Sequence, residues 1–247
     1  MLKKYFKKIF IMIFLMFSVI LTAEDNFMAV GNIKIVRPEP LLIKREDLNI
    51  TIEKDSTIKV ESMYTFSNLG EYDIKSTFMF WLDQTRENDN KDPNNSNKNN
   101  KGKYIKNIKF YSDYKKSQNL RAVIKFDENI YENQSVGNIQ REWFAISQTI
   151  PSKETGKLGV YYDLQNTGFN KTKKFVYSFD LVSNFSEKNK VEILYVNVYN
   201  KSGRKIDSIV YKDYEFKNLT GKKSEKEHYE LLVADVNLDE KLVINFK

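Results

Sequence analysis

The chain has 247 residues, no cysteine and a single histidine, His228. These counts exclude a disulfide framework, a cysteine nucleophile and a zinc site made of several histidines. A Ser-His-Asp triad would require His228, but the chain has no G-x-S-x-G motif, and we expect this histidine at a surface turn. The net charge of +7 includes the four lysines of residues 1–23, and the remainder lacks the clustered positive charge that nucleic-acid binding requires.

Residues 1–23 have the pattern of a secretory signal peptide. Four lysines precede the apolar run Ile9–Leu21, and the small residue Ala23 follows it. The run is shorter than the roughly 20 residues of a membrane-spanning helix and within the roughly 7–15 of a signal-peptide core. We therefore expect an exported protein, periplasmic or extracellular, that meets the membrane only through a signal peptide cleaved after Ala23.

Apolar residues at every second position dominate the rest of the chain, which is the pattern of half-buried β-strands. The alternating stretches are, in chain order, residues 48–52, 58–66, 74–82, 158–164, 175–181, 191–195 and 242–246. They are rich in the aromatic and β-branched residues that strand interiors prefer, and no helical periodicity follows residue 23. Short polar turns between them predict an all-β fold of antiparallel sheets packed as a β-sandwich.

Residues 84–102, QTRENDNKDPNNSNKNNKG, contain no large apolar side chain. Such a segment cannot bury enough surface to offset the entropy lost on ordering, so it predicts a long disordered loop between two strands. The loop is either an insertion at a tolerant surface position or a mobile binding loop. It does not match a calcium-binding loop, because Lys91 occupies the third position and the sixth is not glycine. We expect no metal and no cofactor.

The length of the chain allows two domain organisations. Residues 24–150 and 151–247 would each suit an immunoglobulin-like sandwich of about 100 residues, with the loop 84–102 in the first of them. No proline-rich linker separates the two halves. We therefore expect either one large sandwich or two closely packed immunoglobulin-like sandwiches.

Carboxylates are the remaining candidates for chemistry. A glycoside hydrolase requires two of them about 5–10 Å apart. The acidic groups nearest in sequence are Glu46/Asp47 and Asp235/Asp239/Glu240. Adjacent residues on a strand point to opposite faces, so Glu46 and Asp47 should not converge on one ligand. We interpret this pair as polar residues at the start of a strand that accept backbone N–H groups.

Trp81 and Trp143 are the candidates for ligand binding, since sugar-binding sandwiches use exposed aromatic rings as stacking surfaces. Trp81 is out of phase with Phe78 and Phe80 and therefore belongs to the opposite side of its strand. Met79 shares the phase of Trp81, which also fits a second buried face of the sheet. Ligand contact and burial are therefore both open alternatives for Trp81.

Two stretches carry a recognisable pattern. In Arg45–Leu82, an acidic-Asp-Leu-x-Ile strand precedes a Val-x-x-x-Tyr-x-Phe-x-Asn strand, and Trp143–Leu164 contains a Gln-x-Ile-Pro segment followed by Val-x-Tyr. The positions that carry the pattern are Glu46, Asp47, Leu48, Ile50, Val60, Tyr64, Phe66 and Asn68, then Gln148, Ile150, Pro151, Val160 and Tyr162. Together these stretches resemble a secreted bacterial family catalogued as domain of unknown function 4424. The resemblance implies an exported β-rich protein and supplies no catalytic residues.

The leading prediction is a non-enzymatic exported β-sandwich protein that acts through protein or surface contacts in the cell envelope. Glycan or cell-wall binding through Trp81, Trp143 or exposed tyrosines is the first alternative, and a carboxylate-pair glycoside hydrolase is the second. A third alternative, strand donation to fibre subunits, requires an exposed edge strand. The expected partner is accordingly another protein or a cell-envelope glycan, and not a nucleic acid.

Overall fold

The computed structural model describes residues 29–31, 34–35, 40–85, 105–112, 124–126, 139–164, 173–179, 190–221 and 226–247. The predicted signal peptide, residues 1–23, lies outside these ranges. The predicted loop 84–102 also lies outside them, except for residues 84 and 85, which belong to a strand that continues further than the alternation indicated. Within the described ranges, no helix has the length and hydropathy of a membrane span.

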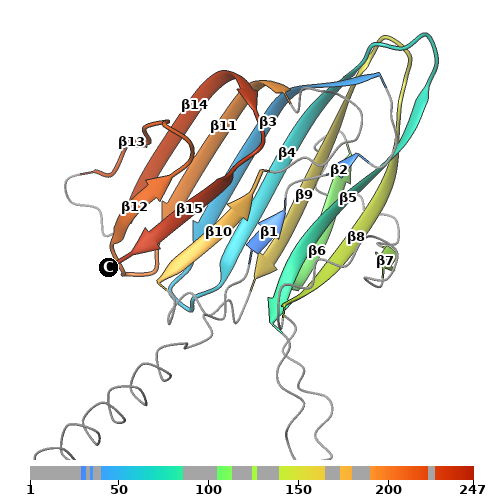
Figure 1. Ribbon diagram of the computed structural model, residues 1–247. Coiled ribbons are helices and arrows are strands. Elements are labelled where there is room, and N and C mark those ends of the chain that lie inside the picture. The colour runs from blue at the N-terminus through green and yellow to red at the C-terminus, as the bar shows by residue number, and fades with distance from the viewer. Residues whose placement is uncertain are drawn as a thin grey trace, which may run out of the picture.

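The regular elements of the described residues are all strands, which confirms the all-β prediction, and they form two sheets (Figure 1). Sheet A contains β1 (Ala29–Gly31), β2 (Lys34–Ile35), β5 (Ile74–Thr85), β7 (Ile124–Phe126), β8 (Ile139–Ile150), β10 (Lys174–Ser178), β12 (Ile206–Val210) and β15 (Lys241–Phe246). Sheet B contains β3 (Leu41–Ile52), β4 (Ile58–Asn68), β6 (Ile105–Ser112), β9 (Thr155–Leu164), β11 (Lys190–Asn200), β13 (Lys217–Asn218) and β14 (Glu227–Asn237).

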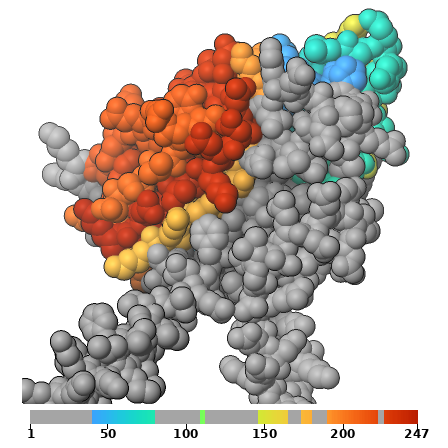
Figure 2. All heavy atoms as spheres, in the orientation of Figure 1, coloured from blue at the N-terminus to red at the C-terminus, as the bar shows by residue number. Residues whose placement is uncertain are grey.

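The strand order places the C-terminal strands at one side of both sheets. Sheet A runs β12-β15-β10-β1-β5-β8-β7, with β2 also paired to β5, and sheet B runs β13-β14-β11-β3-β4-β9-β6. In Figure 1 sheet A lies in front of sheet B, with β12 and β13 at the left and β8 at the right. The C-terminal strands, orange to red, form a continuous surface at the left of Figure 2.

The prediction of purely antiparallel sheets is wrong for two strand pairs. β1 pairs in parallel with β10, and β3 pairs in parallel with β11. The reason is that side chains alternate between faces in the same way in parallel and antiparallel strands, so the alternation does not reveal the direction of a neighbour. The β3–β11 pair joins residues 148 positions apart, as in the contact between Lys44 and Glu192.

Both sheets contribute side chains to one hydrophobic core. Leu48 and Val60 belong to it from sheet B, and Phe175 and Ile244 from sheet A. Each sheet includes strands from before and after residue 150, since β1 pairs with β10 in sheet A and β4 with β9 in sheet B. The predicted boundary at residue 150 falls in the turn between β8 of sheet A and β9 of sheet B.

A β-bulge in β3 decides which of its polar residues enters the core. Lys44 and Arg45 are both partly exposed between the buried residues Ile43 and Glu46, and the register with β4 shifts at this point. An extra residue changes the phase of the alternation, so side chains beyond it exchange faces. Glu46 therefore points inward with Leu48, on the face that would otherwise be entirely apolar.

The buried carboxyl of Glu46 lies in a polar cluster within the core. The Ser62 hydroxyl is 3.2 Å from Oε1 of Glu46 and 2.9 Å from the hydroxyl of Tyr64, so hydrogen bonds link the three residues. Tyr177 of β10 also hydrogen-bonds with Tyr64 and Ser62, which connects sheet A to this cluster. Such partners are needed because an unpaired polar group in an apolar core is costly.

The same burial shifts the ionisation of the tyrosines around Glu46. Burial raises the pKa of Tyr162 and of Tyr177 well above the ordinary 10.0, and the negative charge of Glu46 adds to the effect. Burial, followed by Glu46, likewise raises the pKa of Tyr211, whose hydroxyl has no hydrogen-bond partner among the described residues. The core therefore holds these phenols in their neutral form.

We predict that the free energy of unfolding falls as the pH rises above the ordinary tyrosine pKa of 10.0 and is insensitive to these groups below it. Above that pH the unfolded chain releases phenolic protons that the folded chain retains, at about 1.4 kcal/mol per pH unit for each such group. Urea unfolding at a series of alkaline pH values measures the slope. Tyr177→Phe should make the slope shallower, whereas Tyr72→Phe, at a side chain that is 59% exposed, should not change it. Equal slopes for both variants would contradict the prediction.

Candidate functional site

The acidic pair of the sequence lies inside β3 and does not form a reactive site. Glu46 and Asp47 point to opposite faces, as predicted, with Glu46 in the core. Asp47 is on the outer face of sheet B, where its two carboxylate oxygens accept hydrogen bonds from Nε of Arg45 at 2.8 and 2.9 Å. The partner of Asp47 is thus a guanidinium group, in place of the backbone N–H groups expected at a strand start.

Tyr64 and Phe66 belong to the interface between the two sheets. Their rings stack with centroids 5.9 Å apart, and Phe66 packs at 4.8 Å against Phe78 of β5 in sheet A. All three side chains are buried. Aromatic pairs of this kind contribute about 0.5–1.5 kcal/mol beyond the burial of their area. These residues of the Tyr-x-Phe-x-Asn pattern therefore stabilise the core.

Asn68 connects two of the places where the chain crosses between the sheets. Its Nδ2 lies 2.8 Å from the carbonyl oxygen of Tyr72 and 3.0 Å from those of Ile150 and Pro151. Its Oδ1 accepts the N–H of Gly70 at 2.8 Å. The turn from β4 to β5 and the turn from β8 to β9 are thus bound to one buried side chain. We call this arrangement the Asn68 clasp.

The two tryptophans are at directly paired positions of two neighbouring strands. Trp81 in β5 pairs in register with Trp143 in β8, but their side chains lie outside the described part of the structure. The described residues before Trp81 show that β5 is covered on both faces, since Phe78 is 1% and Met79 4% exposed. The register places the two tryptophan positions together, which their separation in the sequence does not reveal.

The outer face of sheet B carries polar groups that are largely satisfied by one another. His228 lies in β14 with its Nε2 2.9 Å from Oδ1 of Asn197, and its ring stacks on Tyr199 at 4.4 Å. Asn197 in turn donates to Oδ1 of Asn49 at 3.1 Å. Two further bonds of 2.6 Å on this face join Tyr195 to Glu230 and Tyr161 to Asp163. These polar groups therefore already have hydrogen-bond partners within the protein.

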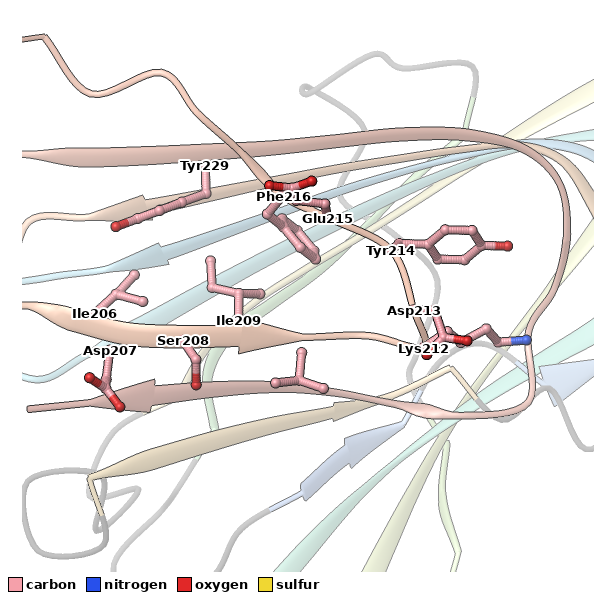
Figure 3. A pocket seen from close by; sticks show the side chains of 11 residues that line it. Ile206, Asp207, Ser208, Ile209, Lys212, Asp213, Tyr214, Glu215, Phe216 and Tyr229 are labelled. Carbon is pink, nitrogen blue, oxygen red and sulfur yellow. The ribbon is translucent and has the colours of Figure 1, made fainter.

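An open groove of about 620 Å³ lies at the side where both sheets end (Figure 3). β12 is the last strand of sheet A there, and the segment of residues 211–216 leads from it to β13, the last strand of sheet B. Ile206 and Ile209 point from β12 toward Phe216, which comes from that segment, and toward Tyr229 of β14 (Figure 3). Both sheets and their connection therefore form the walls.

The floor of the groove is the margin of the hydrophobic core. Ile209, Tyr214, Phe216 and Tyr229 are partly buried and pack against core residues. Val210, at the end of β12, is 48% exposed. When a partner covers apolar surface that was in contact with water, the complex is stabilised by about 25 cal/mol for each Å² covered. This margin is therefore suited to a bound apolar group.

The wall formed by residues 211–216 is fixed in place at its start. Tyr211 is fully buried, with its ring 4.5 Å from that of Phe179. Lys212 has a left-handed backbone (φ 49°), which is unfavourable for a residue with a Cβ. Its ammonium donates to the carbonyl oxygen of Asn237 at 2.7 Å and pairs with Asp239. These contacts hold the strained backbone and position the wall.

Carboxylates dominate the rim of the groove. Asp207, Asp213 and Glu215 line it and are exposed, whereas Lys212 is the one cation among the described residues that line it. Asp207 is 3.6 Å from the ammonium of Lys247, and Lys212 is already paired with an aspartate outside the groove. Among the residues that line the groove, negative charge therefore exceeds positive charge. The described residues include no group of three or more His, Asp or Glu side chains that could hold a metal ion.

Sequence reasoning missed the groove, although a local signal exists. The segment YKDYEF, residues 211–216, alternates aromatic and charged residues without the strict period of two that marks a strand. Aromatic residues in such a segment are expected to contact the core while the charged residues remain in water. The location of the groove itself depends on which strands end the two sheets, and this is a property of the pairing.

No family model and no curated protein matches the chain. Among solved structures, a Legionella pneumophila protein assigned as nutrient-binding has a TM-score of 0.60 at 9% identity, over 89% of this chain and 70% of that chain. A protein assigned as a protease from Parabacteroides distasonis has a TM-score of 0.49 at 7% identity, covering 85% of this chain and 41% of that chain. An M1 zinc metallopeptidase from Deinococcus radiodurans gives 0.39 at 12% identity, with coverages of 84% and 42%. The first likeness establishes a shared fold alone, and the chain spans about two-fifths of the other two proteins.

We predict that Asn68→Ala lowers the free energy of unfolding by about 2–4 kcal/mol, because buried carbonyl groups lose their donor. Asn68→Asp should be at least as destabilising, since it places a carboxylate against those carbonyl oxygens. Urea unfolding monitored by tryptophan fluorescence measures both. The matched control is Asn237→Ala at an exposed position, with an expected change within about 0.5 kcal/mol. A similarly small change for Asn68→Ala would show that the clasp does not stabilise the fold.

Proposed function

We propose that this chain is an exported β-sandwich protein that binds another protein of the cell envelope through the groove at β12, without a chemical step. The observation that carries the proposal is a groove at the side where both sheets end, with an apolar floor that packs against the core and a rim of carboxylates. The signal-peptide pattern of residues 1–23 supports export. The similarity of Arg45–Leu82 to the family of unknown function supports distant membership of that family of secreted proteins.

The properties of the groove favour binding of a protein segment. Ligand sites are concave and mostly apolar, with a few polar groups that set orientation. Here Ile209 and Phe216 provide apolar surface, and Asp213 and Glu215 provide charge. On the outer face of sheet B, by contrast, Asn49, Asn197 and His228 already bond to one another. The groove is therefore the better candidate for contact with a partner.

We predict that a photoreactive benzophenone residue at Val210 gives a discrete cross-linked product in cells that export the protein. The same residue at Leu69, which is 55% exposed in the turn after β4, is the matched control and should not give this product. Mass spectrometry of the product identifies the partner. No product at Val210, or the same product at both positions, would reject the groove as the binding site. Hydrolysis of cell-wall material that disappears in Asp213→Asn/Glu215→Gln would reject the absence of a chemical step.

The second candidate function is binding of a cell-envelope glycan at the paired tryptophan positions. It is favoured by the register of β5 and β8, which sets Trp81 opposite Trp143. Two aromatic residues at facing positions of a sheet are neighbours, as a stacking surface for a sugar requires.

For this candidate we predict that Trp81→Ala weakens binding to purified cell-wall glycan by about tenfold, the loss of roughly 1.4 kcal/mol. Sedimentation with insoluble cell-wall material measures the binding. Tyr72→Ala, at an exposed aromatic in the turn before β5, is the control and should bind like the unchanged protein. Equal binding of the Trp81 variant and the unchanged protein would reject glycan stacking.

A further inference from the structure

We infer that the partner enters as an extended, lysine- or arginine-rich segment that pairs with β12 as an added strand of sheet A. The inference rests on the proposed function and names the chemistry of its partner. β12 is the last strand in the order of sheet A, and β15 is its only partner among the described strands. An unpaired strand edge presents backbone N–H and C=O groups that an extended peptide can complete.

The start of β12 is protected and its end is open. The N–H of Ile206 donates to the carboxylate of Glu227 at 2.9 Å, so this part of the edge already has an acceptor. A register shift at Asp207 separates it from the following residues. Bulges and charges are devices that keep unwanted strands away from an edge. Among the described contacts, no bulge or carboxylate acceptor protects the backbone edge of the remaining residues, Ser208–Val210. These residues line the groove.

The groove accommodates the side chains that an added strand would direct toward it. Successive side chains of a strand alternate between faces, so every second residue of the peptide would face the apolar floor at Ile209 and Phe216. The other residues would face solvent and the rim. A peptide with alternating apolar and polar residues therefore fits the groove.

The charge of the rim selects the polar residues of that peptide. Asp213 and Glu215 are exposed and negatively charged, and the ammonium of Lys212 is paired with Asp239. Opposite charges across an interface accelerate association and discriminate against like-charged partners. A lysine- or arginine-rich strand matches this rim, and an acidic strand is repelled.

The test uses fluorescence anisotropy with three labelled synthetic peptides of alternating residues: valine and lysine, valine and threonine, and valine and glutamate. The valine–lysine peptide should bind about tenfold more tightly than the valine–threonine peptide, and the valine–glutamate peptide should bind more weakly than either. A valine–lysine peptide with N-methyl groups on alternate amides should lose about tenfold or more in affinity, because it cannot complete the edge. Binding should also slow amide hydrogen exchange at Ser208–Val210.

The charge preference is tested with Asp213→Asn/Glu215→Gln, which should abolish the advantage of the lysine peptide. The control Glu71→Gln/Glu154→Gln removes the same number of exposed carboxylates from the turns near the Asn68 clasp and should keep that advantage. Equal affinity for the lysine and threonine peptides would overturn the basic partner while leaving the groove as a binding site. Unchanged affinity of the N-methylated peptide would overturn strand addition. Failure of the Val210 cross-link, in contrast, would reject the proposed function itself, because the groove would not be the binding site.

Discussion

The Asn68 clasp is the interaction on which the arrangement of the two sheets depends. The chain passes from sheet B to sheet A after β4 and from sheet A to sheet B after β8, and one buried amide binds both of these passages. The clasp lies toward the side of the sheets that ends in β6 and β7. The opposite side ends in β12 and β13 and contains the groove. The clasp therefore joins the sheets on one side, and on the other side the N–H of Ile206 in β12 donates to Glu227 of β14 next to the groove.

The core adds a second connection between the sheets that also reaches the groove. Tyr177 brings sheet A to the Ser62 and Glu46 cluster of sheet B. The charge of Glu46 adds to the burial that raises the pKa of Tyr211. The ring of Tyr211 is 5.8 Å from that of Tyr214 in the groove wall. Buried polar groups specify one arrangement of a core when all of them have partners, because any other packing leaves some unpaired. The groove wall itself is joined to the core by the ring contacts of Tyr211 with Phe179 and Tyr214.

Much of the strand content could be predicted from the sequence, because burial of one face requires the alternation seen at Leu48, Ile50 and Ile52. The pairing partner of each strand could not be predicted, because the alternation of apolar residues does not show which strands are neighbours. The pairing of β3 with β11 is an example. The inward position of Glu46 requires a bulge at Lys44, and the register with β4 reveals this bulge only in the folded chain. The role of Asn68 depends on the carbonyl group of Ile150, which is 82 residues away in the sequence. The groove was not predicted at all, because it is defined by which strands end the sheets.

The parallel pair of β3 and β11 also constrains how the chain reaches this structure. β3 is a central strand of sheet B, yet one of its neighbours is 148 residues further along the chain. Contacts between distant residues require the closure of long loops, and proteins dominated by them fold slowly. A nascent chain that has emerged only through β9 lacks β11, so one edge of β3 has no partner strand. Until β11 is available, β3 would be an unprotected strand edge, and rapid delivery of the C-terminal residues would limit aggregation.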